Sequence, residues 1–164
     1  MTEEVLGAAG YHRYEISNYA KPGRECRHNV GYWRRVPYLG LGLGASSFYG
    51  DKRFANTADM SRYLDVTLVG GADGTENLQK LQGTAEVVGR QDAMEEFMFL
   101  GLRLTAGIRA EDFPACFGQD LEEAYGDTLA RLTGEGLLRR TEAGYRLSHR
   151  GIDISNRVLA EFLL

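Results

Sequence analysis

Residues 14–48 read YEISNYAKPGRECRHNVGYWRRVPYLGLGLGASSF, and the rest of the chain is interpreted outward from this stretch. Its first four residues alternate in character and predict a short strand. Residues 18–38 predict a loop that carries many cationic, polar and aromatic side chains. These are Tyr19, Lys21, Arg24, Arg27, His28, Asn29, Tyr32, Trp33, Arg34, Arg35 and Tyr38. Cations beside aromatic rings suit a ligand that is both planar and anionic.

The end of the stretch alternates leucine and glycine from Leu39 to Gly44. In an extended segment this spacing leaves one face without side chains, so a flat ligand or another backbone can approach it closely. A tightly packed strand would show the same alternation. Both interpretations predict an extended backbone here.

The segments on either side predict an α+β chain. Residues 2–9 have the pattern of a helix that ends at a glycine, and a strand follows, which is the order of an α/β repeat. Residues 49–54 predict a hairpin with a Gly-Asp turn. A helix capped by Asn56 or Thr57 is then expected to run to Leu68.

A polar, glycine-rich segment at residues 69–89 predicts a boundary between two domains, residues 1–88 and 89–164. The second domain has the pattern of a winged helix, with three helices, a hairpin and a last helix. These elements are expected at residues 93–104, 112–117, 121–133 with Asp120 as cap, 137–141 paired with 145–147, and from 148 or 149 onward. The residues of the last helix expected to face inward are Ile154, Val158, Leu159 and Phe162.

Composition limits the class of protein. A chain of 164 residues can bury a core without disulfides or bound metal. Two distant cysteines favour a reducing cytoplasm, and neither a membrane span nor a secretion leader is expected. The net charge is −4, and acidic residues outnumber basic ones in residues 92–164. Nucleic acid is therefore not an expected partner of that half.

Several sequence blocks occur together in one known family. Within residues 14–48 they are YEISNYA, ECRHN, GYW and YLGLGLGA, and further along they are EEFMFLGLRLTAGI, LTGEGLL and YRLSHRGIDISNRVLAEFL. In this order they resemble the C-terminal part of the oxygen-independent coproporphyrinogen III oxidase-like radical S-adenosylmethionine proteins, especially their haem-chaperone branch. The resemblance implies a remnant of a partial α/β barrel, namely its last helix-strand unit and a hairpin, followed by a winged-helix-like C-terminal domain.

The resemblance also implies cofactors that this chain does not hold alone. Such proteins bind a [4Fe-4S] cluster on a CxxxCxxC motif near the start of the barrel, whereas this chain has only Cys26 and Cys116. S-adenosylmethionine and the cluster are expected in the full-length parent, and neither is expected to bind tightly here. The missing N-terminal barrel, or a second copy in a homodimer, is expected to cover the exposed edge of the remnant. No metal site is expected on Cys26 and His28, because no further ligand is near them.

Two groups of site residues follow from the resemblance. The residues expected to contact S-adenosylmethionine are Gly44, Ala45 and Ser46. Many haem-chaperone relatives have histidine where Ser46 stands. The residues expected to bind a tetrapyrrole, either coproporphyrinogen or haem, are Arg27, His28, Asn29, Tyr32 and Trp33. Neutral imidazole is a common haem ligand. The alternative for His28 is a loop histidine that hydrogen-bonds its own backbone.

The predicted function is that of the C-terminal portion of such a protein, acting in haem biosynthesis or haem delivery and covering the active site. The chain alone is predicted to be inactive as an enzyme. The alternative is a winged helix that binds nucleic acid or a protein partner. Acidic side chains on the helix that would enter the major groove argue against DNA. They are Asp120, Glu122, Glu123 and Asp127. The arginines of the predicted wing, in contrast, favour DNA binding. They are Arg139, Arg140, Arg146 and Arg150.

Overall fold

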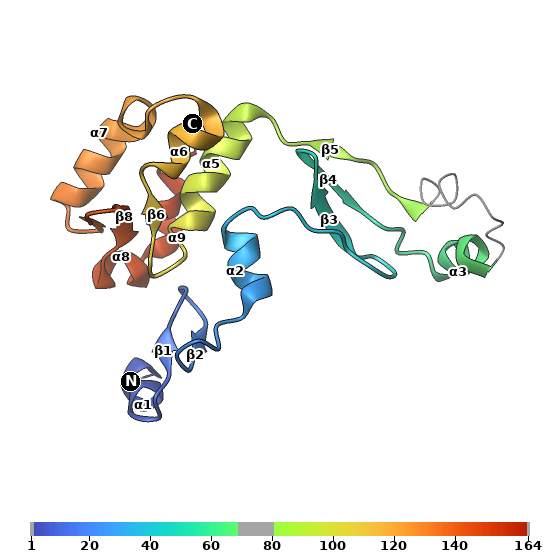
Figure 1. The fold of residues 1–164 in the computed structure, drawn as a ribbon, viewed down its shortest axis with the longest axis horizontal. Helices are drawn as coiled ribbons and strands as arrows, with labels where there is room; N and C mark the ends of the chain where they lie inside the picture. The colour runs from blue at the N-terminus through green and yellow to red at the C-terminus, as the bar shows by residue number, and fades with distance from the viewer. Residues whose placement is uncertain (1, 69–80, 164) are drawn as a thin grey trace. The chain divides into compact units, whose positions relative to one another are not determined.

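The computed structural model describes residues 2–68 and 81–163, and Figure 1 shows its helices and strands. In chain order they are α1 (Thr2–Ala8), β1 (His12–Arg13), β2 (Tyr19–Ala20), α2 (Arg27–Trp33), β3 (Ser46–Tyr49), β4 (Lys52–Ala55), α3 (Met60–Leu68), β5 (Glu86–Val87), α5 (Arg90–Gly101), β6 (Ile108–Arg109), α6 (Asp112–Phe117), α7 (Leu121–Gly134), β7 (Leu138–Arg140), β8 (Gly144–Leu147), α8 (His149–Asp153) and α9 (Ser155–Ala160). Helices are mixed with small antiparallel sheets, and none of the sheets in the described ranges is closed.

The chain forms two compact units, which are Met1–Val36 together with Arg90–Leu164, and Pro37–Gly89. The sequence predicted domains at residues 1–88 and 89–164. The contacts instead group the first 36 residues with the C-terminal part. The predicted division stays a prediction, and most of the boundary segment on which it was based, residues 69–80, lies outside the described residues.

The strand predicted over residues 14–17 is wrong, because these residues form the bend of a β1–β2 hairpin. Glu15 explains the bend. Its carboxylate is fully buried, and it accepts a hydrogen bond from the Ser17 backbone N–H at 2.7 Å. Beyond the hairpin, Glu15 makes a single antiparallel bridge to Leu104. A buried acidic side chain that bonds locally favours a turn over a continuous strand.

The loop predicted over residues 18–38 is interrupted by α2, so this expectation is also wrong in part. The helix begins where the Cys26 carbonyl accepts from the Val30 N–H at 3.0 Å. It ends at Trp33, and Arg35, two residues further on, has a left-handed φ of 53°. The Arg35 guanidinium forms an ion pair with buried Glu96 of α5 at 2.9 Å. The Cys26 side chain makes no capping bond, so the usual N-cap signal is absent from the sequence.

The unit Pro37–Gly89 is built on a three-stranded sheet in the order β3-β4-β5. The predicted hairpin turn is confirmed: Gly50 and Asp51 have φ values of 58° and 55°, as a two-residue turn between twisted strands requires. The helix α3 is capped by Asp59, whose carboxylate accepts from the Arg62 N–H at 3.1 Å. The predicted cap at Asn56 or Thr57 is therefore wrong.

The alternating leucine and glycine residues do not form the extended segment that was predicted. Gly42 and Gly44 have φ values of 105° and 65°, so the backbone turns twice within the run. The amide of Asn56 donates to the carbonyls of Gly40 and Gly42 at 3.3 and 2.8 Å and holds the loop closed. Because the side chain of Asn56 bonds this loop, it is not available to cap α3.

The C-terminal elements pack around one apolar core. Its fully buried side chains include Met98, Phe113, Leu129, Val158 and Phe162. The strands form an antiparallel sheet in the order β6-β8-β7. The helices α6 and α7 lie where they were predicted, and the Asp120 carboxylate accepts from the Glu122 N–H at 2.8 Å, as expected of the cap. The short strand β6 was not predicted.

The predicted last helix is two helices, α8 and α9, which meet at Ile154. Ile154 has a φ of −118° and a ψ of 31°, outside the helical range, and is 39% exposed. Its predicted inward orientation is therefore wrong. Val158, Leu159 and Phe162 are buried, as predicted.

Candidate functional site

The helix α2 carries all five residues that were predicted to bind a tetrapyrrole, but it distributes them over different faces. Successive residues of a helix are rotated by about 100°. His28 and Tyr32 therefore share one face, and their rings lie edge to face at 4.4 Å between centroids. Trp33 and Asn29 share a second face, and Arg27 lies on a third. One flat ligand cannot contact all five side chains at once.

Trp33 is half-buried and is held in place by its neighbours. The Arg103 guanidinium lies over the indole ring at 4.3 Å from the centroid. Arg103 also forms an ion pair with the fully buried Glu15 at 3.3 Å. These contacts join α2, the bend of the β1–β2 hairpin and the residues after α5. Trp33 thus positions α2, and its contact with a tetrapyrrole stays a prediction.

The Arg27 face of α2 lines a groove of about 670 Å³. Arg27, Val30, Gly31 and Arg34 follow each other at helical spacing along its wall. Leu104 and Ala106 also line the groove. The two arginines are about 10 Å apart along the helix axis, with an apolar surface between them. This arrangement suits an amphiphile that carries separated carboxylates.

His28 is exposed in the first turn of α2. The hydrogen bond to its own backbone that was considered for a loop histidine is not among the hydrogen bonds of the described residues. The Tyr32 ring orients one side of the imidazole and leaves the other accessible. An accessible imidazole is able to ligate haem iron.

The residues predicted to contact S-adenosylmethionine lie in the unit Pro37–Gly89. The backbone N–H of Gly44 donates to Thr57 at 2.9 Å, and the carbonyl of Ala45 accepts from Asn56 at 2.9 Å. Ser46 begins β3 and lines a hollow of about 250 Å³. Ser46 is therefore the member of this predicted group that borders a hollow, while Gly44 and Ala45 maintain the loop.

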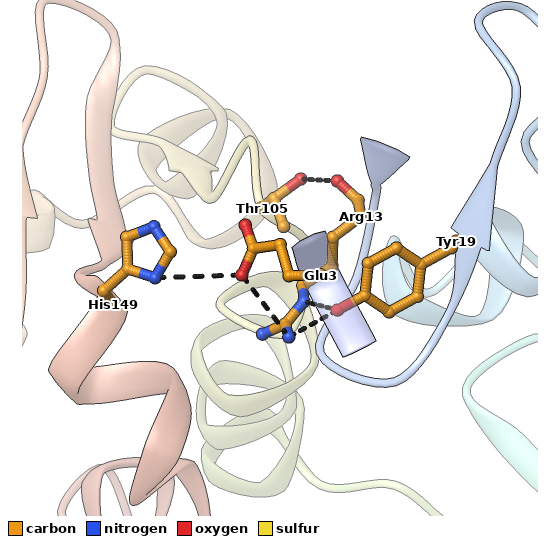
Figure 2. Close-up of polar contacts among 5 residues, drawn as sticks. All are labelled: Glu3, Arg13, Tyr19, Thr105 and His149. Carbon is orange, nitrogen blue, oxygen red and sulfur yellow. Dashed lines mark hydrogen bonds and ion pairs between the residues drawn. The ribbon is translucent and has the colours of Figure 1, made fainter. Parts of the chain in front are cut away.

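A second cluster was not predicted from the sequence. Figure 2 shows Glu3 between Arg13 and His149, with ion-pair distances of 3.7 and 4.0 Å. The Arg13 guanidinium also donates to the Tyr19 hydroxyl at 2.8 and 2.5 Å, and the Thr105 hydroxyl donates to the Arg13 carbonyl at 3.2 Å. Thr105 and His149 are far in the sequence from Glu3, Arg13 and Tyr19, so no local spacing indicates the cluster.

Within residues 2–68 and 81–163 no group of three or more His, Cys, Asp and Glu side chains could hold a metal ion. In the same ranges no helix is both long and apolar enough to cross a membrane. Cys26 and Cys116 are both exposed and unpaired with each other.

Comparison with known proteins supports the resemblance seen in the sequence. Residues 88–154 match the family described as the HemN C-terminal domain. The heme chaperone HemW of Bacillus subtilis is 36% identical over 96% of this chain, and that of Escherichia coli is 32% identical over 98%. The mouse radical S-adenosyl methionine domain-containing protein 1, mitochondrial, is 30% identical over 97%.

A solved structure shows the same fold. The coproporphyrinogen III oxidase HemN from Escherichia coli, a radical SAM enzyme, matches 99% of this chain with a TM-score of 0.68 and 17% identity. This chain covers 39% of that structure and 40% of the two HemW relatives. The predicted recognition is confirmed, since residues 88–154 match the HemN C-terminal domain. The chain resembles the C-terminal part of HemW heme chaperones in particular.

Proposed function

We propose that this chain is the C-terminal part of a haem-handling protein of the HemW type and supplies one wall of its tetrapyrrole site. The relatives that carry the name heme chaperone support haem as the ligand. The preceding part of the same protein would supply the other wall. It would also hold S-adenosylmethionine and the [4Fe-4S] cluster, with Ser46 as a contact, and the chain alone would not be an active enzyme.

The observation that carries this proposal is the exposed imidazole of His28 at the start of α2. Arg27 precedes it in the same turn and lines the groove that Arg34 also borders. His28 ligates the iron, and the arginines bind propionates through charge-assisted hydrogen bonds. Tyr32 offers flat apolar area beside the imidazole.

The C-terminal elements are proposed to act as a winged-helix-like domain that contacts protein. Their order of helix, strand, two helices and two strands supports this assignment. The side chains of Glu122 and Glu123 are exposed on α7, and Glu122 is bonded to the Tyr145 hydroxyl at 2.6 Å. An acidic α7 would be repelled by phosphates. Salt-sensitive binding of random duplex DNA to this chain would favour the nucleic-acid alternative.

Haem titration of the 164-residue chain tests the ligand proposal. We expect a modest Soret shift, because one wall of the site buries only one face of the ring. His28→Ala should remove this shift. His149→Ala is a matched control, since it deletes another exposed imidazole, on α8. A shift that survives in His28→Ala eliminates this histidine as the ligand, and loss in both variants would mean nonspecific imidazole binding.

A further inference from the structure

A cleft of about 680 Å³ lies between the N-terminal segment α1-β1-β2 and the β7–β8 hairpin with α8, within one compact unit. The polar contacts around Glu3 in Figure 2 border it. A volume of this size is typical of pockets that bind small organic molecules. The cleft does not include α2, so it is a different site from the proposed haem wall.

Two of the three arginines that line the cleft belong to the hairpin. Arg139 and Arg146 face each other directly in the register of β7 and β8, and both line the cleft. Like charges at directly opposed positions of a sheet destabilise it. In the part of the chain that the structure describes, neither guanidinium has a hydrogen-bond or ion-pair partner. The adjacent Arg140, in contrast, is 3.8 Å from the Glu122 carboxylate and does not line the cleft.

The opposite wall of the cleft is also cationic. Arg13 is oriented by the Tyr19 hydroxyl, and its side chain is 20% exposed. Glu3 is the only acidic side chain among the described residues that line the cleft, and it lies between Arg13 and His149. Residues 92–164 are acidic as a whole. The collection of arginines here is therefore a local feature and does not reflect the composition.

We propose that this cleft binds a small organic anion whose phosphate or carboxylate group is held by Arg139 and Arg146. Two guanidinium groups at adjacent strand positions can each donate to one oxyanion. An anion between them also removes their mutual repulsion. Tyr11, Leu147 and Ile152 provide apolar area for the body of the ligand. The Glu3 carboxylate is an internal anion that competes for the cationic wall.

A small ligand fits these observations better than a duplex. The arginines lie in a cleft with a carboxylate on its rim, whereas DNA would contact exposed cations along the whole hairpin. Arg140 would then contribute as much as Arg139. Comparing the effects of replacing Arg139 and Arg140 therefore distinguishes a small anion from duplex DNA as the ligand.

The test is isothermal titration calorimetry of the 164-residue chain at low salt with phenyl phosphate, benzoate and, as a neutral control, benzyl alcohol. We expect one or both anions to bind and the alcohol not to bind. Arg139→Gln and Arg146→Gln should each weaken binding roughly tenfold, the effect of losing a charge-assisted hydrogen bond. Glu3→Gln should tighten it severalfold. Arg140→Gln, with the same change of charge on the same hairpin, should change it less than about twofold.

The outcomes decide between the sources of the anion. Binding of phenyl phosphate alone assigns a phosphate ligand, and binding of benzoate alone assigns a carboxylate. If the folded chain, verified by circular dichroism, binds neither anion, the proposal is overturned. Equal losses in Arg139→Gln and Arg140→Gln, or tighter binding of duplex DNA than of either anion, would also overturn it. His28→Ala, the variant that tests haem binding, lies on α2 and outside this cleft, whereas its control residue His149 lines the cleft.

Discussion

Replacing Glu15 with glutamine should destabilise the unit that contains both chain ends. Glu15 is fully buried and accepts from the Ser17 N–H at 2.7 Å and from the Arg103 guanidinium at 3.3 Å. Glutamine has nearly the same shape but only one acceptor oxygen. Its amide would place N–H donors against either the Ser17 N–H or the Arg103 guanidinium. One strong hydrogen bond is then lost, and a donor group faces another donor.

The magnitude follows from the burial of the two partners. Removing one partner of a buried ion pair costs about 3 to 5 kcal/mol, but Arg103 is 24% exposed, so water compensates it in part. We therefore expect a loss of about 2 kcal/mol in the free energy of unfolding, near the value of one hydrogen bond to a charged group. For a unit of this size, the melting temperature should fall by about 8 °C.

Thermal unfolding followed by far-ultraviolet circular dichroism measures this change. Glu142→Gln is the control, because Glu142 is exposed in the β7–β8 turn and should change the stability by less than about 0.5 kcal/mol. A double-mutant cycle with Arg103→Gln should give a coupling energy of about 1 to 2 kcal/mol. If the effects of Glu15→Gln and Arg103→Gln simply add, the two side chains do not interact as described.

Two further predictions concern backbone space and alkaline pH. Gly107→Ala should lower the free energy of unfolding by about 3 kcal/mol or more, because a Cβ there would meet the Tyr145 carbonyl oxygen. Gly118→Ala is the control: Gly118 has a similar left-handed φ but open space around it, so the loss should be about 1 kcal/mol. Equal urea midpoints for the two variants would contradict this prediction. Burial and the nearby Glu95 raise the pKa of Tyr125 to about 12, so its contribution to stability is complete below pH 10 and is lost as the pH rises toward 12. Urea titrations over that pH range should show a smaller loss of stability in Tyr125→Phe than in the unchanged chain. Equal losses of stability in the two proteins would mean that Tyr125 does not cause the pH dependence.

The sequence was sufficient where the determinants of structure are local. The turn at Gly50 and Asp51 depends on two residues that accept a positive φ. The helix α7 depends on the Asp120 cap and on apolar residues at helical spacing. The sequence blocks were also enough to indicate the HemN C-terminal domain, which matches residues 88–154, and the haem-chaperone relatives. Each of these features is encoded within a few neighbouring residues.

Tertiary structure decided the geometry of both candidate sites. The helix α2 has no capping side chain, and it is held by Trp33 against Arg103 and by Arg35 against Glu96, contacts that span more than 60 residues. Its helical rotation separates site residues that are consecutive in sequence. The cleft beside Arg139 arises only when the first strands pack near the β7–β8 hairpin. Local patterns specify turns and caps, whereas long-range burial and ion pairing determine which side chains share a surface.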